Sequence, residues 1–80
     1  MKPIKGGKIV TTVENQELIA EGDSLKKVVI HNLSEDEINI IINKGNKIPI
    51  SSDEAIRLGT LKVISIVVVE KGSTVRYIGV

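Results

Sequence analysis

The sequence contains no cysteine, no tryptophan and no phenylalanine, and Tyr77 is its only aromatic residue. Without thiols the chain can form neither a disulfide nor a thiolate metal site. Proteins that bind single-stranded nucleic acid stack bases on aromatic side chains, and small-molecule pockets are usually rich in aromatic residues. The composition therefore disfavours a protein that binds single-stranded nucleic acid and weakens the interpretation as a small-molecule-binding protein. The core must be built from Ile, Val and Leu.

An excess of charge of one sign is also lacking. The 11 Lys and Arg against 10 Asp and Glu give a net charge of +1, which provides no long-range field to attract nucleic acid or an anionic membrane. No apolar run approaches the ~20 residues of a membrane span. The opening MKPIKGG lacks the apolar middle of a signal peptide. We expect synthesis in the cytoplasm, no nucleic-acid partner and no membrane partner.

Short β-branched segments separated by turn residues follow one another along the chain. The expected strands lie at residues 8–13, 17–20, 26–33, 37–43, 48–50, 55–58, 63–69 and 74–80. Turns at this spacing are typical of sandwiches and barrels, so the sequence predicts an all-β fold, a compact antiparallel β-sandwich (jelly-roll-like) of roughly seven to eight short strands. Residues 1–7 are expected to be a flexible basic arm and residues 8–80 a single sandwich domain.

Alternation within the expected strands predicts the core and one turn. The residues expected to be buried are Val28, Ile30, Ile38, Ile40 and Ile42, together with one face of residues 63–69. The turn residues 71–73 predict a hairpin between the last two strands. Such a hairpin would leave residues 74–80 at the edge of a sheet, where another chain can pair.

Residues that carry chemistry are few. His31 is the only histidine, and Ser34 and Asp36 lie close to it in sequence, but ordinary turn residues explain that proximity better than a catalytic triad does. The acidic residues 35–37 and 53–54 lack the spacing of a calcium loop. The sequence thus predicts no enzyme, no cofactor and no metal site. A binding pocket would have only Asn39, Asn43 and Arg76 as plausible polar candidates.

The segment from Val63 to Val69 holds one polar residue, Ser65. In a regular strand one face would carry Val63, Val67 and Val69, and the other Ile64, Ile66 and Val68. A two-layer sandwich covers one face of each sheet, so the other face is covered either by a loop of the same chain, with the N-terminal arm as the main candidate, or by a second subunit. We favour the second subunit and expect a homo-oligomer. The candidate interface residues are Val63, Ile64, Ile66, Val67, Val68, Val69, Arg76 and Ile41.

The order of these segments resembles a known group of proteins. An opening strand "KIVTTV" precedes the lysine-led "KKVVIHNLS", then "EINIIIN", a stretch ending "AIRLG", and the closing "VISIVVVEKGSTVRYIGV". This pattern, from about Gly7 to the C-terminus, resembles small virion accessory proteins of tailed bacteriophages. The sequence departs from them by being shorter and by lacking the second turn glycines often seen before the middle strands.

The resemblance implies a non-enzymatic structural protein of the virion, synthesised in the host cytoplasm. Such a protein decorates or stabilises the capsid, or completes the neck or tail, through contacts with viral capsid or tail proteins, often as a symmetric oligomer. The alternative from another functional class is a cytoplasmic β-sandwich module that binds a protein or a small ligand.

Overall fold

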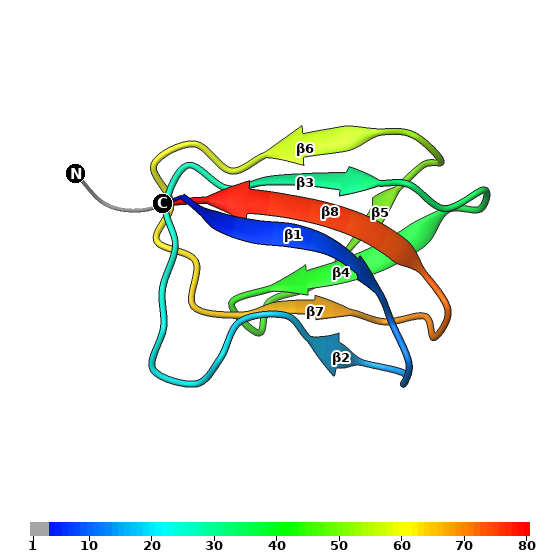
Figure 1. Cartoon of the computed structure of the whole chain (residues 1–80), viewed down its shortest axis with the longest axis horizontal. Helices are drawn as coiled ribbons and strands as arrows, with labels where there is room; N and C mark the ends of the chain where they lie inside the picture. The colour runs from blue at the N-terminus through cyan, green and yellow to red at the C-terminus, as the bar shows by residue number, and fades with distance from the viewer. Residues whose placement is uncertain (1–3) are drawn as a thin grey trace.

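Two antiparallel sheets of four strands each pack face to face (Figure 1). The computed structural model describes residues 4–80, which form no helix, so none is long and apolar enough to cross a membrane. The first sheet has the order β1 (Lys5–Val10), β8 (Thr74–Gly79), β3 (Val29–Asn32), β6 (Ala55–Arg57). The second has the order β2 (Gln16–Glu17), β7 (Ile66–Val68), β4 (Ile38–Ile42), β5 (Lys47–Ile50). The predicted all-β antiparallel sandwich is confirmed.

The strands are paired from the two ends of the chain inward. β1 pairs with β8, β2 with β7, β3 with β6 and β4 with β5, each antiparallel. The pairings of β3 with β8 and of β4 with β7 complete the two sheets. Every connection except the turn between β4 and β5 therefore crosses from one sheet to the other (Figure 1).

The predicted hairpin between the last two strands is wrong. β7 and β8 belong to different sheets, and β8 lies inside its sheet between β1 and β3 rather than at an edge. The turn at residues 71–73 instead carries the chain across the sandwich. Thr11 holds this corner, since its hydroxyl donates to the Glu70 carbonyl oxygen (2.8 Å) and accepts from the Ser73 N–H (2.9 Å).

The first strand begins earlier than the sequence predicted. β1 runs from Lys5 to Val10 instead of over residues 8–13, so residues 5–7 of the expected arm belong to the sheet, while residues 1–3 lie outside the described residues. Gly6 explains the difference. It has a φ of +143°, and a Cβ at this position would collide with the carbonyl oxygen of Tyr77 on β8. The glycines that suggested a flexible arm permit a close approach of two strands.

The core lies between the sheets and is aliphatic. Its buried residues are Ile19, Leu25, Val28, Ile30, Ile38, Ile40, Ile42, Ile50, Val63, Ile66, Val68 and Val75. The five core residues predicted in residues 28–42 are among them, so that prediction is confirmed. Tyr77 packs against the core from the first sheet, and its hydroxyl donates to the Leu18 carbonyl oxygen at 3.4 Å.

Candidate interaction surface

The apolar segment at residues 63–69 is not one regular strand. Val63 forms an isolated bridge with Leu25, the ladder of β7 starts only at Ile66, and the two residues between them have no ladder partner. The alternation therefore changes phase inside the segment. Val63, Ile66 and Val68 all point into the core, which strict alternation forbids.

The side chain of Asn43 satisfies the backbone at this irregular point. Its Oδ1 accepts hydrogen bonds from the N–H groups of Ile64 (2.8 Å) and Ser65 (3.3 Å), and its Nδ2 donates to the carbonyl oxygen of Lys62 (2.9 Å). These bonds replace the ladder hydrogen bonds that the irregular segment lacks. Asn43 thus has a structural role that the sequence did not indicate.

Glu17 on β2 also forms hydrogen bonds to the segment in which the ladder is interrupted. Its carboxylate accepts from the Ser65 hydroxyl (2.5 Å) and from the N–H of Ile66 (2.8 Å), and it also accepts from the N–H of Leu18 (3.1 Å). A carboxylate that replaces a ladder acceptor gives charge-assisted hydrogen bonds. No local signal in the sequence links Glu17 to a segment almost fifty residues away.

The eight predicted interface residues do not form one surface. Val63, Ile66 and Val68 are core residues, so their side chains cannot contact another molecule while the chain is folded. Of the remaining residues of this segment, Ile64 is 53% exposed, and Val67 and Val69 are half-buried.

The two predicted interface residues from other strands lie on opposite sheets. Ile41 faces Val67 across the ladder, and Glu17 and Lys47 flank this pair on the outside of the second sheet. Arg76 belongs to β8, on the outside of the first sheet. The second side of residues 66–69 is therefore a small apolar strip rather than a bare hydrophobic face.

The outer face of the first sheet has a distinct chemistry. The register places Lys8, Arg76 and His31 in one row across β1, β8 and β3, and Ile78, Val29 and Arg57 in the next row across β8, β3 and β6. Lys8, Arg76, Arg57 and Ile78 are exposed. The strand positions of this face include no carboxylate, although the whole chain has a net charge of only +1. This face is basic and partly apolar.

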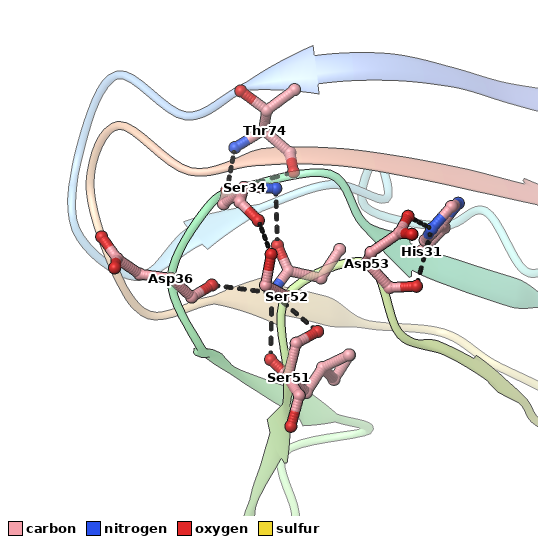
Figure 2. A network of polar contacts seen from close by, with 9 residues as sticks. His31, Ser34, Asp36, Ser51, Ser52, Asp53 and Thr74 are labelled. Atoms are coloured by element: carbon pink, nitrogen blue, oxygen red, sulfur yellow. Dashed lines mark hydrogen bonds and ion pairs between the residues drawn. The ribbon is translucent and has the colours of Figure 1, made fainter.

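A polar network joins two loops at one end of the sandwich (Figure 2). Its centre is Asn32, which is fully buried. The Nδ2 group donates to the carbonyl oxygens of Asp36 (2.9 Å), Ile50 (3.0 Å) and Ser51 (3.1 Å), and the Oδ1 accepts from the N–H of Ser34 (2.8 Å). The network fixes the positions of the turn after β3 and the turn after β5 relative to each other.

His31, Ser34 and Asp36 are not arranged as a triad. His31 Nε2 lies 2.8 Å from the carboxylate of Asp53, on the other loop (Figure 2). The Ser34 hydroxyl donates to the Thr74 carbonyl oxygen (3.3 Å) and accepts from the Thr74 N–H (2.7 Å). Asp36 takes part in the network through its backbone oxygen. Within residues 4–80 no three His, Asp or Glu side chains are grouped to hold a metal ion.

The polar candidates for a ligand pocket do not converge. Asn39 donates through its Nδ2 to the Glu70 carboxylate at 2.9 Å, Asn43 is bonded to backbone, and Arg76 lies on the other sheet. An open hollow of about 580 Å³ lies elsewhere, beside the turn after β2. Charged residues of both signs line it, namely Glu17, Glu21, Asp23, Lys44 and Lys62.

No protein-family model, no curated protein and no solved structure matches the chain. Its own fold and surface chemistry therefore carry the functional proposal.

Proposed function

We propose that the chain is a structural protein of a tailed-phage virion. It decorates or stabilises the capsid, or completes the neck or tail, through contacts with capsid or tail proteins, and it acts as a homo-oligomer without catalysing a reaction. The resemblance of its strand pattern to small virion accessory proteins is one support. The strand order β1-β8-β3-β6 against β2-β7-β4-β5 is the basis on which we also propose a jelly-roll topology, an architecture used by viral capsid domains.

The observation that carries the proposal is the outer face of the first sheet. Lys8 and Arg76 lie in the row next to Ile78 and Val29, Arg57 lies beside Val29, and the strand positions of this face include no carboxylate. Protein interfaces combine apolar area with polar groups and are enriched in Arg. A partner with acidic side chains around an apolar centre would complement this face in charge, whereas three cations without aromatic residues form a poor nucleic-acid site.

The test is to recover tailed-phage particles from the lysate in which the chain is naturally produced and to analyse them by peptide mass spectrometry. We expect the chain to copurify with the particles through a density gradient. A charge-reversed Arg76→Glu/Arg57→Glu variant should be folded by circular dichroism but depleted from particles, while the control Lys47→Glu, on the other sheet, should stay bound. Absence of the unmodified chain from particles would overturn the proposal.

The alternative, a cytoplasmic binding module, is favoured by one feature, the open hollow beside the turn after β2. Its lysines and carboxylates offer contacts to a zwitterionic small ligand or to a peptide. In that case the chain stays in the particle-free fraction, and Lys44→Ala or Lys62→Ala changes ligand binding while the Arg76 and Arg57 variants do not.

A further inference from the structure

The edge formed by β1 differs from the other three edges of the sandwich. β6 and β2 have three and two residues, and β5 contains Pro49, which cannot donate to a ladder. Short strands and proline are devices that protect sheet edges from other chains. β1 has six residues and no proline, and its outer backbone has no partner strand within the described residues. It is the edge best suited to accept another strand.

Apolar side chains accompany this edge. Ile4, just before β1, is 69% exposed, Val10 at its end is 56% exposed, and Ile78 on β8, opposite Gly6, is 45% exposed. In the alternation of β1, Ile4 and Val10 share the outer face with Gly6 and Lys8. The strand thus has an apolar residue at each end of one face and two small or flexible positions between them.

We propose that two copies of the chain associate through antiparallel pairing of β1 with β1 of the second copy, with Gly7 on the two-fold axis. The pairing joins the two first sheets into one continuous sheet. The inference develops the self-association in the proposed function, but it does not depend on the virion assignment.

The register follows from the alternation of hydrogen-bonding groups. In β1 every second residue directs its N–H and C=O away from β8, and an antiparallel partner must match residues of that same set. A two-fold axis between two copies of β1 therefore passes through a residue, and the central candidates are Gly6, Gly7 and Lys8. Only the side-chain pairs distinguish these three registers.

An axis at Lys8 places two ammonium groups directly opposite each other, which destabilises a sheet pair. An axis at Gly6 places Ile4 opposite Lys8 of the second copy. An axis at Gly7 places Ile4 opposite Val10 of the second copy, twice by symmetry, and each Lys8 opposite a glycine. This register pairs the exposed apolar residues and separates the cations, so the strand is complementary to itself.

The hollow above the glycines supports the same register. It has a volume of about 270 Å³ and is lined by Ile4, Gly6, Gly7, Arg76 and Ile78, among others. Because Gly6 has no side chain, the methylene stem of the second copy's Lys8 can lie over Gly6 and against Ile78, with its ammonium group in water. The pairing would also place the two basic outer faces side by side.

A single introduced cysteine tests the axis directly, because the chain has no other thiol. Gly7 has no positive φ, and a Cβ added to it meets no atom within 4 Å, so Gly7→Cys fits the fold. Residues opposite each other in antiparallel strands have Cα atoms about 4.5–5.5 Å apart, within disulfide range. Under mild oxidation Gly7→Cys should form covalent dimers at least tenfold faster than Lys62→Cys, an exposed position outside β1.

Lys8→Cys is the matched control within the strand, because its two thiols would be offset by two residues in the proposed register. Faster cross-linking of Lys8→Cys than of Gly7→Cys would overturn the register, and rates equal to that of Lys62→Cys for both would overturn the pairing. Sedimentation adds a test without thiols: Val10→Lys should raise the dimer dissociation constant about tenfold, and Leu61→Lys should leave it unchanged. A monomeric wild type would overturn the inference while leaving particle binding to be judged by mass spectrometry.

Discussion

Replacement of Asn32 tests the network that joins the two loops at the end of the sandwich. Asn32 is fully buried, and its amide contacts three carbonyl oxygens and one N–H group, all of them backbone groups. An amide has two N–H donors, so two donated bonds and one accepted bond are lost in Asn32→Ala. At about 0.5–1.5 kcal/mol each, the expected loss of unfolding free energy is about 3 kcal/mol.

This loss is a large part of the unfolding free energy of the whole domain. A domain of 80 residues has an unfolding free energy of about 4–12 kcal/mol, at roughly 0.05–0.15 kcal/mol per residue. Urea denaturation followed by far-ultraviolet circular dichroism measures the change, since the chain has no tryptophan to report by fluorescence. We expect a clear shift of the midpoint to lower urea with an unchanged slope.

Two further variants separate hydrogen bonding from side-chain volume. Asn32→Asp keeps the shape but removes both donors and directs a carboxylate at three carbonyl oxygens, so at neutral pH it should cost more than Asn32→Ala. His31→Ala, the adjacent residue on the outer face, should cost less than about 1 kcal/mol. An Asn32→Asp protein as stable as wild type, or a cost below 1 kcal/mol for Asn32→Ala, would refute the role assigned to the amide.

Three other predictions concern the core and the surface. Ile40→Ala should cost about 2–5 kcal/mol by cavity formation, and an unmoved urea midpoint would contradict its central position. A double-mutant cycle on His31 and Asp53 should give a coupling below about 1 kcal/mol, because the Asp53 side chain is 87% exposed, and a coupling above 2 kcal/mol would contradict the surface position of the pair. Val68→Lys should abolish the cooperative unfolding transition whereas Val67→Lys keeps it; the reverse result would refute the phase of β7.

Apart from the start of β1, the approximate positions of the strands could be predicted from the sequence, because they depend on local signals. Turn residues separate all eight strands, and the alternation of Ile38, Ile40 and Ile42 with Asn39 identified the core face of β4 correctly. The buried face of a strand can be predicted from its sequence whenever its ladder is regular, because successive side chains then point to opposite faces.

The partners of the strands could not be predicted in the same way. The turn at residues 71–73 shows that the chain reverses, but not which sheet the next strand joins. That choice depends on contacts such as the bond from Thr11 to Glu70, which joins residues 59 positions apart. The close approach of β1 to β8 at Gly6 is equally non-local.

The surface predicted at residues 63–69 differs from the one in the structure for a related reason. The prediction at residues 63–69 assumed that one regular ladder runs through the whole segment. Under that assumption the apolar residues divide between two faces, and the second face needs a cover. Glu17 and Asn43 accept hydrogen bonds from Ile64, Ser65 and Ile66, where the ladder is interrupted. The interruption lets the side chains of Val63, Ile66 and Val68 all point into the core.

Ile4, the most exposed of the large apolar residues, lies in the segment that the sequence predicted to be a flexible basic arm. A Lys-Gly-Gly-Lys segment resembles a frayed terminus, because glycine adds backbone freedom and lysine favours water. In the structure these four residues are the first part of the edge strand β1, and the absence of side chains at the two glycines leaves Ile78 uncovered beside Ile4. An interface need not be marked by a hydrophobic run: the one we propose at β1 is marked by glycines that leave apolar neighbours exposed.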